Sequence, residues 1–121
     1  MSHHPPKTLR IKDALDDIQD ALTWIDRHIG SISRDEFLTD RKTLGSVVKN
    51  LVDIGEAANN IMQSDATIES SKPDLWNHLV GAYAMRIKLT HGYRSIDASV
   101  VWNTVKIHLP EFRQVISAAL K

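Results

Sequence analysis

The 121-residue sequence has no cysteine, and this absence excludes disulfide bonds, thiolate nucleophiles and thiolate metal sites. It also lacks an apolar run long enough to cross a bilayer, and its start, MSHHPP, has no apolar stretch typical of a signal peptide. Neither charge is in excess, because fifteen basic residues balance fifteen acidic ones, so any polyanion site must be a local patch. We therefore expect a cytoplasmic protein without a membrane contact.

The residues that are present favour the all-α class. Aromatic residues make up only 6%, glycines number five, and long charged stretches are frequent. Apolar residues recur at spacings of three and four, which predicts four main helices. We expect them over residues 7–29, 40–62, 74–90 and from the cap residue Asp97 onward. Together these helices predict an antiparallel four-helix bundle that occupies residues 7–121 as one domain. We expect residues 1–6 to form a disordered tail.

Start and stop signals set the ends of these helices. Gly30 is expected to end the first helix, and Ser33 with Glu36 forms a capping box ahead of a short turn. Residues 63–72 are polar and predict the longest connection. Pro110 interrupts the last helix, so we expect a kink or two collinear segments that keep one apolar face.

The third helix holds a charged residue where its pattern requires an apolar one. Its apolar stripe consists of Leu75, Leu79, Ala82, Arg86 and Leu89. A second row beside this stripe, which should leave little of the helix for water, consists of Trp76, Val80, Tyr83 and Ile87. A buried guanidinium costs on the order of several kcal/mol unless it is paired. Arg86 therefore either pairs with a carboxylate or lines a cleft that accepts an anion. The simpler alternative is that its stem is buried while its head reaches water.

Arg86 and His91 frame the segment RIKLTHGY, in which four residues separate them. An arginine can hold two phosphate oxygens in a planar fork, and a histidine exchanges protons near neutral pH. Gly92 is expected to stop the helix and to free His91 and Tyr93 from the regular helical surface. Around a straight helix Arg86 and His91 diverge. They meet only if the helix ends at His91 or if a second copy supplies the partner.

These groups suit cleavage of RNA without a metal ion. His91 would act as general base or acid at the 2′-hydroxyl, and Arg86 would stabilise the charged phosphorane. Because the 2′-hydroxyl is an internal nucleophile, no metal is needed. The other internal histidines lack the spacing of metal ligands, and the sequence has no glycine-rich phosphate loop. We predict neither a metal site nor a cofactor.

The arrangement Arg86-x4-His91-x-Tyr93 resembles the HEPN superfamily, and specifically the HepT toxins of prokaryotic toxin–antitoxin pairs. The likeness spans nearly the whole chain and includes FLTDR at 37–41 and NLVDIGEAAN at 50–59. The resemblance implies a homodimeric ribonuclease that halts growth by cutting RNA. It further implies a cognate minimal nucleotidyltransferase as antitoxin, which attaches AMP to the motif tyrosine. By this resemblance, Arg86 and His91 are expected to be the catalytic pair and Tyr93 the modification site.

One residue departs from the family pattern. The position after the motif arginine is commonly polar in this superfamily, and here it is Ile87, so Lys88 and Thr90 become candidates for RNA contact. Glu56 could pair with Arg86 of the same or the other subunit, or remain a solvated carboxylate.

Two alternatives therefore stay open. The first is a non-catalytic helical partner, or nucleotide-binding subunit, of a minimal nucleotidyltransferase. The second is a dimerisation module in which Arg86 is paired inside the interface. RNA, a second copy and the antitoxin are the expected partners of the leading hypothesis.

Overall fold

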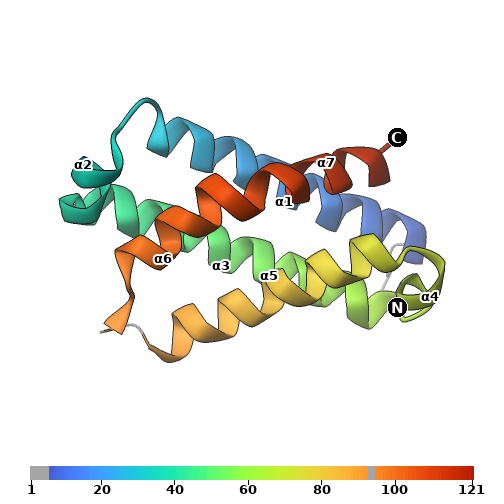
Figure 1. Cartoon of the computed structure of the whole chain (residues 1–121). Helices are drawn as coiled ribbons and strands as arrows, with labels where there is room; N and C mark the ends of the chain where they lie inside the picture. The colour runs from blue at the N-terminus through green and yellow to red at the C-terminus, as the bar shows by residue number, and fades with distance from the viewer. Residues whose placement is uncertain (1–5, 93–94) are drawn as a thin grey trace, which may run out of the picture.

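The computed structural model describes residues 6–92 and 95–121, and these residues form helices and no strands. The elements are α1 (Lys7–Ile29), α2 (Arg34–Thr39), α3 (Arg41–Ser64), α4 (Ile68–Ser71), α5 (Pro73–His91), α6 (Ala98–Asn103), η2 (Thr104–His108) and α7 (Leu109–Ala119). Figure 1 shows that α1, α3, α5 and the α6–α7 segment alternate in direction, which confirms the antiparallel four-helix bundle. The predicted disordered tail, apart from Pro6, lies outside the described residues. None of the described helices has both the length and the apolar character that a bilayer crossing requires.

The start and stop signals act as predicted at Gly30 and Asp97, and the capping box at Ser33 forms in its first half only. α1 begins at Lys7 and ends at Ile29, where Gly30 takes a positive φ of 50° that favours glycine. The Ser33 hydroxyl accepts a hydrogen bond from the backbone N–H of Glu36 at 3.2 Å and donates one to its carboxylate at 3.0 Å. Asp97 caps α6 by accepting a hydrogen bond from the backbone N–H of Ser99 at 2.9 Å.

The prediction of one long polar connection over residues 63–72 is wrong. α3 continues to Ser64, and the short helix α4 occupies residues 68–71. The reason is Ile68, which is 6% exposed and joins the hydrophobic core. A single apolar side chain in a polar segment is enough to fold that segment back onto the bundle, because a buried isoleucine contributes about 1.5–3 kcal/mol.

The predicted break in the last helix lies one turn before Pro110. Residues 104–108 form η2, a π-helical turn, and Pro110 sits in the first turn of α7, where its missing N–H is not needed. The core residues Val101, Val105 and Leu109 follow one another at intervals of four residues. The two intervals together take eight residues, whereas two α-helical turns take about 7.2. The wider turn absorbs the extra residue and keeps Leu109 in the core.

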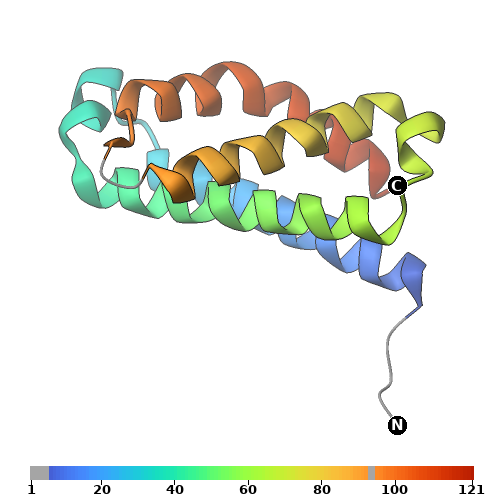
Figure 2. The ribbon, with the colours of Figure 1, turned by 90° about the horizontal axis from the view of Figure 1, so that it is seen from below.

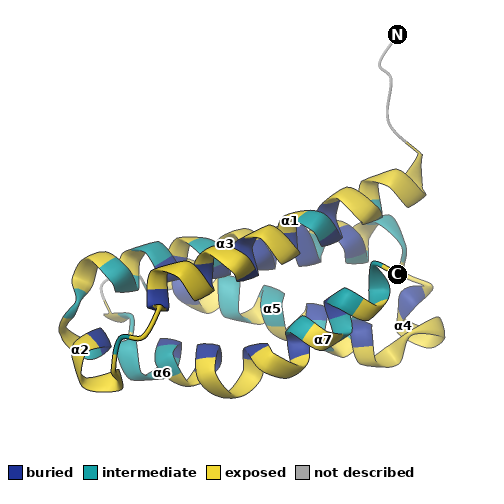
Figure 3. Cartoon of the chain, turned by 90° about the horizontal axis from the view of Figure 1, so that it is seen from above, coloured by how far each residue is buried: buried dark blue, intermediate teal, exposed yellow. Residues whose placement is uncertain are grey.

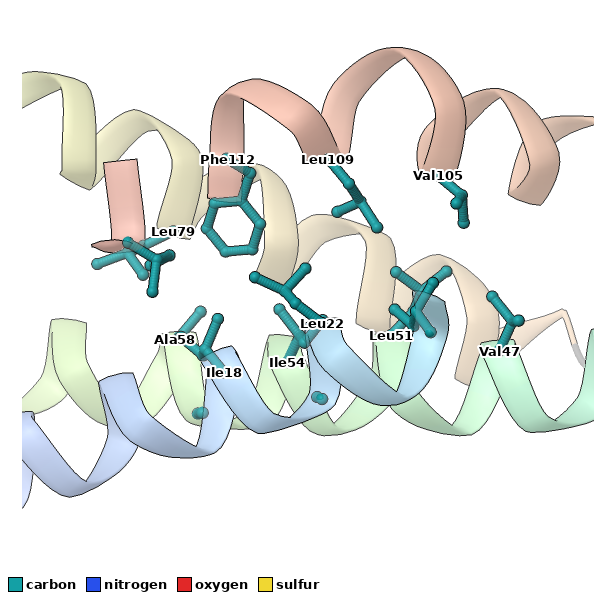
Figure 4. Packing of buried hydrophobic residues seen from close by; sticks show 14 of the residues in the cluster. Ile18, Leu22, Val47, Leu51, Ile54, Ala58, Leu79, Val105, Leu109 and Phe112 are labelled. Carbon is teal, nitrogen blue, oxygen red and sulfur yellow. The ribbon is translucent and has the colours of Figure 1, made fainter. Parts of the chain in front are cut away.

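The core lies between the inner faces of the four long segments, and Figure 4 shows side chains from all of them meeting there. Fully buried side chains come from every long helix, among them Ile18, Ile54, Leu79 and Ile116. In Figure 3 the buried residues of each helix face the interior and the exposed ones face outward. Burial of these aliphatic side chains, rather than surface ion pairs, holds the bundle together.

Candidate functional site

α3 and α5 approach each other closely at Gly55, opposite Arg86. A Cβ atom on Gly55 would lie 2.4 Å from Cβ of Arg86 and 2.8 Å from the carbonyl oxygen of Ala82, distances that real Cβ atoms do not show. Only a hydrogen fits between the two helices here. Gly55 therefore lets Arg86 lie directly against α3, and this packing fixes where the guanidinium emerges.

Arg86 pairs with Glu56, the residue that follows Gly55. Nε of Arg86 lies 2.5 Å from Oε2 of Glu56, although Nε is buried and makes no aligned hydrogen bond. We regard the contact as an ion pair, because the distance is short and the hydrogen-bond geometry is poor. The guanidinium carbon also lies 5.9 Å from the centre of the Tyr83 ring. Of the two expectations for Arg86, the structure shows the carboxylate partner.

The pair is open to solvent on one side. The Arg86 side chain is 30% exposed and that of Glu56 is 57% exposed. A guanidinium carries five N–H donors in a fork, and the shortest contact of Glu56 is to Nε. Because Nε is buried, the exposed part of the Arg86 side chain lies elsewhere, and N–H donors there can meet an anion from solvent.

His91 is the last residue of α5 and is exposed. The helix ends there as predicted, and the N–H of Gly92 closes its final turn on the carbonyl of Lys88 at 3.3 Å. The expectation that this end frees His91 from the helical surface is wrong, because His91 itself keeps helical geometry. Its side chain leaves the helix about 140° around the axis from Arg86. Tyr93, the predicted modification site, lies outside the described residues.

The two predicted RNA contacts have different surroundings. The Thr90 hydroxyl donates to the carbonyl of Arg86 at 3.0 Å, so part of its hydrogen-bonding capacity is used by the helix. Lys88 is exposed and lies one turn from His91 on the helix surface. The pKa of Asp97 is lowered, mainly by the hydrogen bond from the Ser99 hydroxyl and to a lesser degree by the charge of Lys88. Lys88 thus places positive charge at the His91 end of α5.

An apolar strip separates Arg86 from His91 on the surface of α5. We call it the α5 stripe. It is the second row of the predicted helix, distinct from the row that contains Arg86, and it consists of Trp76, Val80, Tyr83 and Ile87. The expectation that this row leaves little room for water is wrong, since Val80 is 45% and Ile87 39% exposed. Helical geometry places the stripe about 60–120° around the axis from Arg86, between it and His91. Trp76 and Tyr83 of the same row are half-buried, and Trp76 packs against the core, so the exposed part of the row is Val80 and Ile87.

The histidines outside the motif are scattered over the bundle. His28 stacks on Trp24 with 5.8 Å between ring centres, and His78 stacks on Phe112 at the same distance. Among the residues that the structure describes, no three His, Asp or Glu side chains gather closely enough to hold a metal ion.

The fold and the motif together define a class: an all-α bundle with an arginine–histidine pair near one helix end. The family described as "Ribonuclease HepT-like" matches residues 18–119, most of the chain. The chain therefore belongs to the HepT-like ribonuclease family, as its motif predicted.

Three relatives support this assignment. A protein of Thermococcus cleftensis named "Probable ribonuclease HepT" is 35% identical over 84% of this chain and 88% of its own length. A protein of Methanocaldococcus jannaschii that carries RNase in its name is 29% identical over 97% of this chain and 91% of its own. Another, from Caldanaerobacter subterraneus and also named as an RNase, is 26% identical over 88% and 91%. No solved structure gives a significant match.

Proposed function

We propose that this protein is a metal-independent endoribonuclease and the toxin of a type VII-like toxin–antitoxin system in the cytoplasm of a prokaryote. The observation that carries the proposal is the position of Arg86. Gly55 and Glu56 hold its stem against α3, while part of its guanidinium stays open on the helix that also ends in His91. Membership of a ribonuclease family supports the reaction class.

The reaction needs a base, an acid and a cation, and the motif contains these groups. His91 takes the proton of the 2′-hydroxyl as the 2′-oxygen attacks phosphorus. The bond from phosphorus to the 5′-oxygen then breaks, and a protonated imidazole returns a proton to that leaving oxygen. Arg86 stabilises the charge on the pentacoordinate phosphorane with its fork of N–H donors. The products are a 2′,3′-cyclic phosphate and a 5′-hydroxyl.

We further propose that the site is completed by a second copy of the chain. Arg86 and His91 point away from each other on one α5, and the exposed stripe between them includes Val80 and Ile87. If a twofold axis crosses α5 between Lys88 and Leu89, at the C-terminal end of this stripe, each Arg86 comes next to the other protomer's His91. The groove then holds two imidazoles, one for each proton transfer. Ile87, where the family commonly has a polar residue, contributes apolar contact area.

This assembly can be tested with a charged residue on the stripe. Ile87→Asp should give a monomer in analytical ultracentrifugation and should lose cleavage, because the carboxylate would be buried between two helices. Leu9→Asp is the matched control, since Leu9 is also exposed (49%) but lies at the start of α1. A monomeric wild type that still cleaves RNA would refute the composite site.

The expected antitoxin is a minimal nucleotidyltransferase that attaches AMP to Tyr93. Tyr93 is two residues beyond His91 in the sequence, so the modification would bring an anionic phosphate and added bulk to the end of α5. Both would keep RNA phosphates away. Mass spectrometry of protein co-expressed with the antitoxin should find one AMP on the tryptic peptide that contains Tyr93. An unmodified and inactive protein in that experiment would contradict this mode of neutralisation.

Cleavage itself is tested with AMP-free protein and labelled RNA in excess EDTA. Arg86→Ala and His91→Ala should each lower the rate by about 10²-fold or more, with unchanged helical circular dichroism. His28→Ala is a matched control, because His28 is an exposed helical histidine on α1. Undiminished cleavage in both motif variants, or a strict need for a divalent ion, would overturn the proposed mechanism.

A non-catalytic role is the second candidate, and the ion pair with Glu56 is the observation that favours it. A carboxylate 2.5 Å from Nε offsets the charge that a phosphodiester would otherwise meet. In that case the bundle would serve as the partner or nucleotide-binding subunit of a nucleotidyltransferase. Tight complex formation with this enzyme, together with no cleavage of any RNA over a wide range of protein concentrations, would favour this role.

A further inference from the structure

A pocket lies on the side of α5 that faces the segment formed by η2 and α7. Its volume is about 300 Å³. Leu51 of α3, Met85 of α5 and Phe112 of α7 provide apolar surface in its lining. In Figure 2 the ribbons of α5 and of the C-terminal segment lie above α3 and converge away from the α6 end. Residues of these segments and Leu51 of α3 line the pocket. Neither Arg86 nor His91 is among its lining residues.

The pocket exists because both of its walls leave space. On α5, a Cβ atom at Gly81 would meet nothing within 4 Å, so the helix presents no side chain at that point. On the other wall, the π-helical turn η2 carries Ile107, which lines the pocket and is 65% exposed. Single π-helical turns inside α-helices frequently occur at functional sites. A bundle built only for stability would fill this seam with a larger residue than glycine.

The polar groups of the lining define the ligand. His78 stacks on Phe112 with 22° between the ring planes, and its Nε2 lies 3.7 Å from Oε1 of Glu111. Glu111 is the only one of the lining residues that is an Asp, Glu, Lys or Arg, and its carboxylate is 77% exposed at the rim. Asn77, Thr104 and His108 are the other polar residues of the lining. The pocket thus combines apolar side chains, an aromatic side wall, several neutral polar groups and one carboxylate at its mouth.

We propose that this pocket binds a small organic amine, with a flat apolar body in the seam and a protonated amino group facing Glu111. The volume is at the lower end of the range for small-molecule sites, and a lining that joins apolar side chains to a set of polar groups is typical of them. The carboxylate selects a cationic head over a neutral or anionic one. The proposal does not depend on the ribonuclease activity, because it rests on residues outside the motif.

The test uses 2-phenylethylamine as the probe, with 2-phenylethanol and 3-phenylpropionate as its neutral and anionic counterparts. Titration of ¹⁵N-labelled protein should shift the amide resonances of Gly81 and Ile107 with the amine, less with the alcohol and not with the acid. Glu111→Gln should weaken amine binding by about three- to fivefold, as expected for one exposed ion pair, and should leave alcohol binding unchanged. Equal binding of amine and alcohol to the wild type would overturn the cationic assignment.

Gly81→Leu fills the pocket without straining the fold. The new side chain meets open space, and leucine is a better helix former than glycine, so the variant should be at least as stable as the wild type. It should lose amine binding altogether. Gly45→Leu is the matched control, because a Cβ at Gly45 on α3 also meets nothing within 4 Å but lies outside the pocket. Amine binding that survives Gly81→Leu, or that is lost equally in Gly45→Leu, would refute the site.

Discussion

Replacing Gly55 with alanine should separate α3 from α5 at the point where Arg86 emerges. The new Cβ would lie 2.4 Å from Cβ of Arg86, and ordinary contact begins at 3.4 Å, so the helices must move apart by about 1 Å, the difference of the two. Both obstructing atoms, the Arg86 Cβ and the Ala82 carbonyl oxygen, are fixed to the backbone and cannot rotate away. Overpacking of this kind costs about 1–3 kcal/mol.

Helix propensity acts in the opposite direction. Alanine is favoured over glycine within a helix by about 1 kcal/mol, so the net loss for Gly55→Ala should be about 2 kcal/mol if the strain is near its upper limit. Gly45→Ala lies on the same helix with nothing within 4 Å of its Cβ, and it should instead gain about 0.5–1 kcal/mol. The two variants therefore separate packing strain from propensity.

The assay is urea unfolding followed by circular dichroism, with both variants at the same protein concentration because an oligomer melts in a concentration-dependent way. In thermal melts, a difference of about 3 kcal/mol between the variants corresponds to roughly 12 °C for a chain of this length. Gly55→Ala should also slow RNA cleavage, since a shift of about 1 Å in a catalytic group can cost up to 10²-fold. A Gly55→Ala protein as stable as Gly45→Ala would refute the claim that glycine is required for this approach.

Two further predictions concern charge. The pKa values of Asp40, Asp65 and Asp97 are lowered, chiefly because each carboxylate accepts a hydrogen bond from a nearby hydroxyl. Their stabilisation is fully present above the ordinary value of 3.8 and is lost as the pH falls through the lower folded values, so the urea midpoint should drop below about pH 4. Asparagine at all three positions should keep the hydrogen bonds that these side chains accept from backbone N–H groups and should flatten this drop. An unchanged pH profile would contradict the assignment. Arg113→Lys should lose the bidentate bond to Asp26, now 2.7 and 3.0 Å, and about 0.5 kcal/mol of unfolding free energy at neutral pH, whereas no loss would show that the pair contributes nothing.

Local signals predicted most of the fold because they depend on neighbours in the sequence. The apolar period and Gly30 predicted the observed ends of α1. Ser33 caps α2 as expected, but the Glu36 carboxylate accepts a hydrogen bond from the Ser33 hydroxyl and not from a backbone N–H, so only half of the capping box forms. The connection over residues 63–72 was mispredicted because one buried residue, Ile68, outweighed a polar segment. The break near Pro110 was expected, but its form as a π-helical turn required knowledge of which residues face the core.

The features of the candidate site also fall into two groups, those that the sequence predicted and those that only the tertiary structure revealed. The sequence by itself determined the helical class, the motif and the anomaly of a charged residue in an apolar stripe, since each depends on residue type and spacing. Only the tertiary structure decided that Glu56 partners Arg86, that Gly55 makes room for it, and that Val80 and Ile87 face outward. These facts depend on which faces of α3 and α5 meet, and a periodic pattern specifies that one face of a helix is buried without specifying what lies against it.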